Sequence, residues 1–382
     1  MSDWLKEISL YVHLPWCVSK CPYCDFNSFQ HTPFVQEDVY IDALLRDLEE
    51  EIRFSPQRTV SSIYFGGGTP SLFTGDSIMK LTDGLSKKLT IASDAEITLE
   101  VNPESSVPEK LRQYRVAGIN RISIGVQSFS DQVLTAISRP HNAEDARKSF
   151  SSAREVGFDN INIDLMYGVP AGSKNSDLLD LKEAISLGPE HISRYQLTLE
   201  QGTRFFLSPP DLPNEDEIYR SFAEGFDLLS QNGYLQYEVS AYSQPQKFSR
   251  HNLHYWRYGD YIGIGAGAHG KTTRGGNIYR VEKPKSPSIY MAKFSSHGSA
   301  IERKIIDHSD ALIEYAINAT RLVKGFEVEQ LFERTGIRPD SIEVSQKLKS
   351  AEDRGFLTRE GGLLKPTFQG RLFLDDLQLI FL

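Results

Sequence analysis

All three cysteines of the 382-residue chain lie in one short stretch, Cys17-Val-Ser-Lys-Cys21-Pro-Tyr-Cys24. An odd, tightly clustered set is not a disulfide framework, and in a reducing compartment it is typical of a metal site. Three thiolates on one loop can hold three irons of a 4Fe-4S cluster and leave the fourth iron without a protein ligand. A small molecule that chelates through an amino and a carboxylate group can occupy that open position.

A structural zinc ion is the alternative for the same cysteines. Zinc takes four ligands, for example three Cys and one His, and His13 or His31 could supply the fourth. However, the cysteine spacing is not that of the usual zinc pairs, and the sequence holds no second pair. The spacing therefore favours an iron–sulfur cluster.

Short apolar runs alternate with helical patterns through the first half of the chain. The alternation predicts parallel β–α units, and six units suit an open barrel better than a closed eightfold one. The expected strands are Ile8–His13, Ser62–Phe65, Glu96–Val101, Arg121–Gly125, Asn160–Leu165 and His191–Leu197. The expected helices are Val35–Arg53, Ser77–Leu89, Pro108–Ala117, Ala143–Val156 and Ser176–Ser186.

Polar residues stand where several of these strands end. Glu100, Gln127 and Asp164 follow the third, fourth and fifth strands, and Gly66-Gly67-Gly68-Thr69 follows the second. One such residue is usually a cap or part of a turn. Three at equivalent places predict a shared cofactor role, because functional residues of β–α barrels gather at the carboxyl ends of the strands. The glycines would let the backbone approach a ligand closely.

A second distinctive segment is His251-Asn252-Leu-His254-Tyr255-Trp256. A porphyrin needs a flat apolar slot and often an axial imidazole, and histidine beside aromatic residues offers both. The alternative is a packed aromatic core with a hydrogen-bonded histidine. The pattern leaves open whether His251, His254 or neither ligates iron.

Gly265-Ala-Gly267-Ala-His269-Gly270 formally matches a dinucleotide fingerprint. That fingerprint requires a following helix. Residues 271–276, Lys-Thr-Thr-Arg-Gly-Gly, instead predict a loop, so we expect a close-packed turn and no Rossmann site.

The pattern changes after Gly202. We expect the barrel to span residues 1–205, followed by an α+β extension over 206–300 and a winged-helix-like domain over 301–382. In the extension we expect a helix over Glu215–Gln231 and a strand over Tyr234–Tyr242. The tail predicts helices followed by a hairpin, which favours a structural or docking unit over DNA binding because acidic residues occur throughout it. These tail elements are Ala311–Arg321, Val328–Thr335, Ser341–Arg354 and the hairpin Phe356–Lys365.

The composition sets outer limits on function. The net charge of −9 and the pI near 5.6 argue against nucleic acid as a partner. No apolar run is long enough to span a bilayer, and the polar start, Met1 to Glu7, does not look like a signal peptide. We therefore expect a cytoplasmic protein, with peripheral membrane contact left open.

The cysteine spacing at the end of the first strand, with Tyr23 before the third cysteine, resembles the radical S-adenosylmethionine superfamily. The stretch Tyr11-Val-His-Leu-Pro-Trp-Cys17 and the His-Asn-x-x-Tyr-Trp pattern resemble its oxygen-independent coproporphyrinogen III oxidase family. Asp25-Phe26 after the third cysteine resembles the haem chaperone branch of that family. The oxidases carry a further cysteine at the position of Phe26 and an N-terminal extension. The resemblance covers essentially the whole chain.

This resemblance implies a partial (β/α)6 barrel that binds a 4Fe-4S cluster, S-adenosylmethionine and haem. It implies a haem chaperone that passes haem to an acceptor haemoprotein; the alternatives are radical decarboxylation of coproporphyrinogen III and a zinc-bound interaction module. Reduction of the cluster in this superfamily cleaves S-adenosylmethionine to a 5′-deoxyadenosyl radical.

The resemblance also implies a role for each site residue. Arg139, in Ile-Ser-Arg-Pro-His141, would pair with the methionine carboxylate, which a guanidinium can bind through two hydrogen bonds. Tyr11 would lie near the cofactor or be a core aromatic, and Thr198 is a further, weaker candidate. The implied cluster ligands are Cys17, Cys21 and Cys24. The implied cofactor residues are Gly67, Gly68 and Thr69 at the methionine amino group, Glu100 at the ribose, and Gln127 and Asp164 at the ribose or the amino acid part. The implied haem residues are His251 and Trp256.

Overall fold

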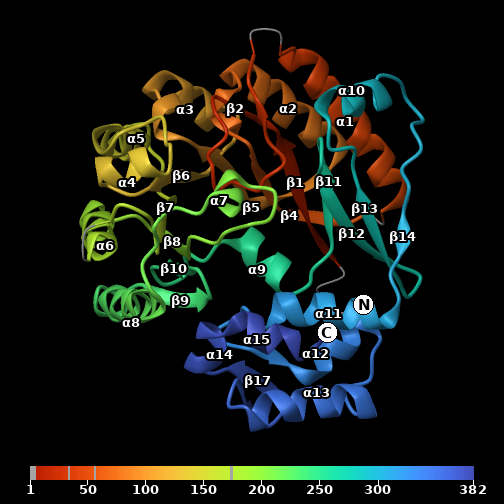
Figure 1. The fold of residues 1–382 in the computed structure, drawn as a ribbon. Coiled ribbons are helices and arrows are strands. Elements are labelled where there is room, and N and C mark those ends of the chain that lie inside the picture. Colours follow the sequence, from red (N-terminus) through yellow and green to blue (C-terminus); the bar gives the residue numbers. More distant parts are fainter. Residues whose placement is uncertain (1–5, 33–34, 56, 173–174) are drawn as a thin grey trace.

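The computed structural model describes residues 6–32, 35–55, 57–172 and 175–382; the first five residues of the polar start lie outside this range. Six parallel strands lie side by side in chain order in its largest sheet (Figure 1). The fold is the expected α/β partial barrel. The strands are β1 (Glu7–Leu14), β4 (Thr59–Gly67), β5 (Thr90–Val101), β6 (Arg121–Gln127), β7 (Ile161–Tyr167) and β8 (His191–Gln196).

Helices connect these strands and cover the outer face of the sheet (Figure 1). Local sequence sets several helix starts: Thr74 accepts a hydrogen bond from the Ser77 amide, and Asn142 forms a reciprocal capping box with Asp145. All five expected helices are confirmed. The connecting helices are α1 (Glu37–Phe54), α2 (Gly75–Lys88), α3 (Pro108–Val116), α4 (Asp131–Ala136), α5 (Ala143–Glu155) and α6 (Ser176–Leu187), with 3₁₀ turns at Pro70–Leu72 and Pro103–Ser105.

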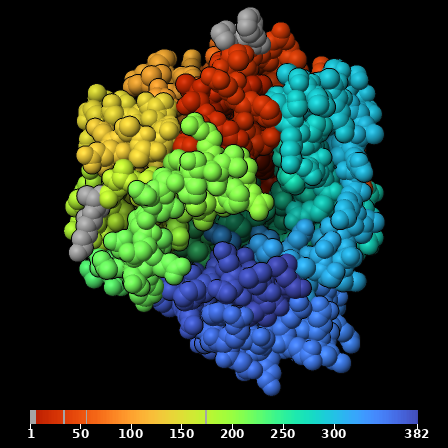
Figure 2. Space-filling view, in the orientation of Figure 1, coloured from red at the N-terminus to blue at the C-terminus, as the bar shows by residue number. Residues whose placement is uncertain are grey.

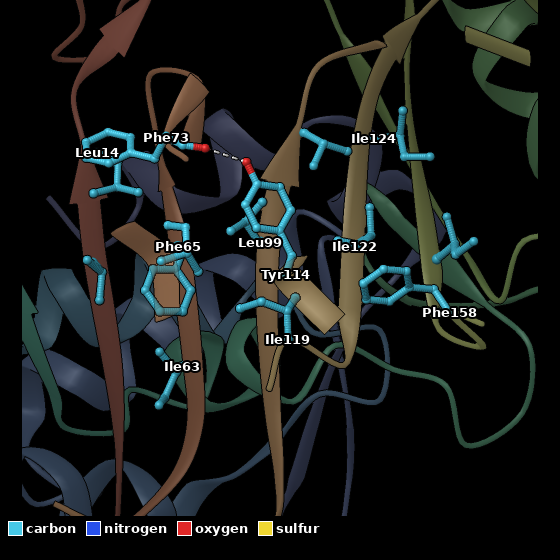
Figure 3. Packing of buried hydrophobic residues seen from close by; sticks show 14 of the residues in the cluster. Leu14, Ile63, Phe65, Phe73, Leu99, Tyr114, Ile119, Ile122, Ile124 and Phe158 are labelled. Atoms are coloured by element: carbon cyan, nitrogen blue, oxygen red, sulfur yellow. Dashed lines mark hydrogen bonds between the residues drawn. The ribbon is translucent and has the colours of Figure 1, made fainter. Parts of the chain in front are cut away.

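The main core lies between the sheet and this helical layer (Figure 3). Leu99 of β5 and Ile122 of β6 are fully buried beside Tyr114 of α3. The Tyr114 hydroxyl donates a 2.7 Å hydrogen bond to the Phe73 carbonyl, which satisfies its polar end inside the core. Each fully buried aliphatic or aromatic side chain of this kind contributes roughly 1.5–3 kcal/mol. This packing fixes the strand ends that carry the polar residues.

The sheet continues beyond the barrel on both sides, to twelve strands. The single strand expected over Tyr234–Tyr242 is wrong: β9 (Leu235–Glu238) and β10 (Ala241–Ser243) are two antiparallel strands next to β8. The chain turns at Val239 because its amide donates to the Arg321 carbonyl rather than continuing the ladder. On the other side, β11 (Tyr261–Ile264) pairs parallel with β1, followed by β12 (His269–Arg274), β13 (Asn277–Glu282) and β14 (Lys304–Ile305).

The glycine-rich segment between β11 and β12 is a close-packed turn, as expected. Gly265 has a φ of +109°, and a Cβ there would lie 2.4 Å from the His13 carbonyl oxygen. The loop expected over 271–276 is wrong, because Lys271 to Arg274 pair with β13 and only Gly275 and Gly276 form the turn.

The tail packs around a second hydrophobic core, which includes Leu312, Leu331, Leu348 and Leu364 and also takes in Tyr258 and Ile278 from outside the tail. The expected three helices and hairpin are confirmed (Figure 1). Its elements are α11 (His308–Ala319), β15 (Phe326–Glu327), α12 (Val328–Thr335), α13 (Ile342–Asp353), β16 (Leu357–Glu360), β17 (Leu363–Pro366), α14 (Phe368–Leu372) and α15 (Leu374–Leu379).

Short elements around the barrel complete the fold. They are β2 (Trp16–Cys17), β3 (Phe29–Gln30), α7 (Arg204–Leu207), α8 (Glu215–Gln231), α9 (Arg250–Trp256) and α10 (Pro287–Lys293). Among the helices of the described residues, none combines the length and the apolar character that crossing a membrane requires.

Candidate functional site

A cavity of 620 Å³ opens at the carboxyl ends of the parallel strands. Figure 2 shows a recess between the green segment that carries α7, the cyan β11–β13 region and the blue C-terminal unit. Most of the sequence-predicted site residues line the cavity. They are Cys17, Cys21, Cys24, Gly67, Gly68, Thr69, Glu100, Gln127, Arg139, Asp164, Thr198 and Trp256.

The three thiols face this cavity from the loop that begins at β2. Each cysteine is half-buried and none forms a disulfide. Burial raises the pKa of the Cys17 thiol, and it raises the pKa of Cys24 to about 11. Metal binding requires thiolates, so loading these residues would release protons. Three thiols on one wall of a cavity suit a cluster that they hold from one side.

The arrangement does not suit a zinc ion. His13 is engaged through both ring nitrogens, at 2.9 Å from the Tyr11 hydroxyl and 2.8 Å from the Asn27 carbonyl, and His31 is exposed. A zinc ion needs its ligands around one centre. Over the described ranges, no three His, Cys, Asp or Glu side chains are placed to hold one metal ion.

The strand ends bring two carboxylates into the cavity wall. Glu100 accepts hydrogen bonds from the Tyr64 hydroxyl at 2.8 Å and the Gly67 amide at 3.3 Å. Burial raises the pKa of Glu100 to about 7, and the charge of Asp164 adds to the rise. Burial also raises the pKa of Asp164, whose oxygens accept from the Ser123 hydroxyl at 3.1 Å and the Asn162 amide at 2.7 Å. Hydrogen bonds fix the orientation of both groups.

Gln127 ends β6 in a strained backbone conformation. Its φ of +67° lies in the left-handed region, which residues other than glycine rarely adopt. Its side-chain oxygen accepts a 2.6 Å hydrogen bond from the Tyr195 hydroxyl of β8. Local strain of this kind is common at ligand sites, because the surrounding structure holds it for function.

Arg139 is held in the cavity wall by neutral groups. Its Nη2 donates to the Asn102 side chain and to the Gly125 carbonyl, both at 2.9 Å, while Nη1 lies 3.7 Å from the Cys21 sulfur. Its Nε is buried without a hydrogen-bond partner. No carboxylate of the described chain lies within 4.0 Å of the guanidinium, which is therefore placed to pair with the carboxylate of a ligand.

Two glycines at the end of β4 are required by the packing of the chain around them. Gly67 has a φ of +117°, and a Cβ there would lie 2.6 Å from the His13 ring. A Cβ on Gly68 would lie 2.6 Å from the Trp16 carbonyl oxygen. The glycines thus let the second strand end pack closely against the chain that leads into the cysteine loop. From the sequence, we expected these glycines only for the close approach of a ligand.

The α9 segment divides between the cavity and the core. Trp256 and Asn252 line the cavity, whereas His251 does not. The His251 ring lies 3.1 Å from the Ser62 hydroxyl and packs at a tilt against Tyr64, with ring centres 5.1 Å apart. Burial lowers the pKa of His251 to about 3. His254 bonds the Asp260 carbonyl at 2.7 Å. The structure therefore brings the tryptophan, and not the histidines, to the cavity.

Tyr11 also lies behind the cavity wall. Its ring stacks on Tyr64 at 6.4 Å, and its hydroxyl bonds His13. Tyr11 is half-buried in this position, and its role near the cofactor stays a prediction.

The structure adds cavity residues that sequence reasoning missed: Asn102, Tyr195, Glu238 and Arg321. Asn102 directly follows β5 in Leu-Glu-Val-Asn-Pro, so its position at a strand end was a usable signal. Glu238 and Arg321 carry no comparable local signal.

Comparisons with known proteins agree with this architecture. Residues 11–185 match the Radical SAM superfamily. The chain is 42% identical over 380 residues to the heme chaperone HemW of Escherichia coli strain K12, with 99% of each chain covered. It is 30% identical to the zebrafish (Danio rerio) mitochondrial radical S-adenosyl methionine domain-containing protein 1, with 97% of this chain and 86% of that protein covered.

A solved structure shows the same fold over nearly the whole chain. The coproporphyrinogen III oxidase HemN of Escherichia coli, a radical SAM enzyme, superposes with a TM-score of 0.82 at 23% identity, covering 98% of this chain and 90% of that one. The barrel and its thiol loop are thus those of a radical SAM protein. By its similarity over 99% of its length, the chain belongs to the family of the heme chaperone HemW. The superfamily implies a 4Fe-4S cluster and S-adenosylmethionine, and the HemW branch implies haem.

Proposed function

We propose that this chain is a haem chaperone, which binds haem in its cavity and passes it to an acceptor haemoprotein. The observation that carries the proposal is that one cavity is lined by the three thiols, by Arg139 and by Trp256. Full-length similarity to proteins named heme chaperones supports it.

The residues present fit the two cofactors that the superfamily implies. Cys17, Cys21 and Cys24 would hold the cluster, and Arg139 would pair with the methionine carboxylate of S-adenosylmethionine. The remaining cofactor contacts would come from the strand-end residues Gly67, Gly68, Thr69, Glu100, Gln127 and Asp164. Together the bound groups would supply one-electron chemistry beside the haem.

The chain's own contribution to haem binding is an aromatic surface in an open cavity. Trp256 offers a flat face, and Phe26, 57% exposed, lies on the cavity rim beside the thiol loop. An open cavity with aromatic contacts holds haem at an affinity that an acceptor can exceed. A fully enclosing pocket would retain the haem and prevent transfer.

The alternative function is the decarboxylation of coproporphyrinogen III, and the test must distinguish it from haem transfer. The likeness to the oxidase HemN, at 23% identity, is a likeness of fold. Phe26 stands directly after the cluster loop, where the resemblance to the oxidases would require a further cysteine, and a phenyl ring cannot bind metal.

The test uses anaerobically reconstituted protein. We expect haem to bind near one per chain in a spectroscopic titration, and to move to apomyoglobin, used as a generic acceptor, when the two are mixed. With reductant, S-adenosylmethionine and coproporphyrinogen III, we expect no protoporphyrinogen. Catalytic formation of that product would overturn the chaperone assignment, and so would failure to bind haem.

A further inference from the structure

The C-terminal unit supplies part of the cavity wall. In Figure 1, α11 lies at the foot of the barrel next to α9. Backbone hydrogen bonds tie the turn after α11 to β9: the Val239 amide donates to the Arg321 carbonyl, and the Val323 amide to the Tyr237 carbonyl, both at 3.1 Å. These bonds place the side chain of Arg321 in the cavity.

Arg321 meets one buried carboxylate and one aromatic ring there. Its Nε and Nη2 donate to Glu238 Oε2 at 3.2 and 2.9 Å, and Nη2 also donates to the Ser240 hydroxyl at 3.3 Å. The guanidinium lies over the Trp256 ring, 4.3 Å from its centre. Within the part of the chain that the structure describes, no hydrogen bond engages Nη1.

A second donor beside Arg321 is left without a partner. The indole Nε1 of Trp256 is buried and makes no hydrogen bond. Buried indole N–H groups normally find an acceptor, because leaving one unpaired costs free energy. The guanidinium is stacked on the face of this indole, so Arg321, with Nη1 unengaged on the cavity wall, is the donor placed to bind an anionic oxygen.

We propose that Arg321, stacked on the Trp256 ring, binds a carboxylate of the cavity's ligand, and that Glu238 holds Arg321 in place while the cavity is empty. The inference rests on the proposed function and extends it: the ligand would be a tetrapyrrole recognised through a propionate side chain. Arg321 is then a specificity residue that the C-terminal unit contributes to the barrel.

The proposal predicts effects of opposite sign for the two partners of the ion pair. The ligand carboxylate gains charge-assisted hydrogen bonds from Arg321, so losing the guanidinium weakens binding. Glu238 is 3% exposed and carries the same charge as the ligand, so neutralising it strengthens binding. A pair that only braces the fold would make both changes harmful or neutral.

The test compares haem with haem dimethyl ester, whose propionates carry no charge. Arg321→Met leaves Glu238 as an unpaired buried charge, so the double change Arg321→Met with Glu238→Gln is measured as well, with thermal unfolding to verify folding. Glu238→Gln alone tests the opposite sign. Arg112→Met, at an arginine 60% exposed on α3, is the matched control.

We expect the double variant to bind haem roughly tenfold to a hundredfold more weakly than the native chain and to bind the ester unchanged. We expect Glu238→Gln to tighten the binding of haem but not of the ester, and Arg112→Met to alter the binding of neither ligand. Equal loss for haem and ester, or native haem affinity in a folded double variant, would overturn the carboxylate site while the chaperone proposal stands. If the native chain binds neither ligand, the proposed function itself fails and the site falls with it.

Discussion

The two ends of the cavity are built in different ways. The thiol wall consists of the three cysteines with Arg139, Glu100, Gln127 and Asp164, all of which lie in or after the parallel strands. The C-terminal wall consists of Glu238, Asn252, Trp256 and Arg321, which come from an edge strand, a short helix and the tail. The first wall follows from the order of β–α units, whereas the second exists only once distant segments have packed together.

The walls also differ in electrostatics. On the thiol wall, the hydrogen-bond partners of Arg139 are neutral, and burial raises the pKa values of the carboxylates Glu100 and Asp164. These groups are not paired with one another. On the C-terminal wall, the charges of Arg321 and Glu238 already pair with each other. A charged ligand can therefore pair directly with Arg139 on the thiol wall, whereas on the C-terminal wall it must compete with the ion pair between Arg321 and Glu238. Substitutions in the thiol wall should therefore leave haem binding unchanged, and substitutions in the C-terminal wall should leave cluster and S-adenosylmethionine binding unchanged.

The largest expected effect is at the thiols. Changing any one of Cys17, Cys21 or Cys24 to Ala should abolish the cluster, which we expect at about four irons per chain after anaerobic reconstitution. Haem binding should survive, because the C-terminal wall is intact. Iron and sulfide analysis with absorption spectra measures both. Ser19→Ala, on the same loop, is the control and should keep its iron; stoichiometric zinc without iron uptake in the native chain would refute the cluster.

Arg139 comes next. Arg139→Ala should weaken S-adenosylmethionine binding by about 2–5 kcal/mol, because a desolvated charge pair loses one partner. The cluster content and haem affinity should not change. Calorimetry on reconstituted protein gives the affinity, with Arg112→Ala as the exposed counterpart. Native affinity in the Arg139 variant would assign this residue a structural role.

Substitutions of Trp256 and His251 test the C-terminal wall and the core behind it separately. Trp256→Ala should weaken haem binding by about 1–3 kcal/mol, because the porphyrin loses an aromatic face. His251→Ala should instead lower the free energy of unfolding and leave the haem spectrum unchanged, since this ring lies against Ser62 and Tyr64. Absorption titrations and denaturant unfolding measure the two. A shifted Soret band in the histidine variant would show that His251 reaches the iron.

The smallest effect concerns Glu100 and pH. Burial raises its pKa from 4.5 to about 7, so between these values the folded chain holds a proton that the unfolded chain has lost. Its contribution to the free energy of unfolding therefore falls as the pH rises through this range. Glu100→Gln should remove that slope, a relative gain of about 3 kcal/mol at pH 8 compared with pH 4. Urea unfolding at both pH values measures it.

The control for this prediction is Glu109→Gln, at a carboxylate whose side chain is 73% exposed on α3. It should leave the pH dependence of unfolding as in the native chain. An unchanged slope in Glu100→Gln would mean that the proton of this site is held elsewhere, for example by Asp164.

Much of the barrel could be predicted from the sequence, because strand and helix periodicities are local. The six parallel strands and five of the six connecting helices were predicted, with ends displaced by a few residues; the short helix α4 was not. The region from 234 to 276 was harder. Tyr234–Tyr242 reads as one strand, yet the contact of Val239 with Arg321 splits it, and β11 gains its place by pairing with β1, more than two hundred residues earlier.

The same division applies to the site. Residue types and spacing by themselves predicted the three-thiol chemistry and the polar strand ends, because each depends on a few neighbouring residues. Arg139 was predicted only through the resemblance to a known family. Tertiary structure decided that Trp256 faces the cavity while His251 is buried behind it, that Glu100 has a raised pKa, and that Arg321 meets Glu238 from 83 residues away. Burial and long-range contact are properties of the packed chain, and no local pattern encodes which side chains it brings together.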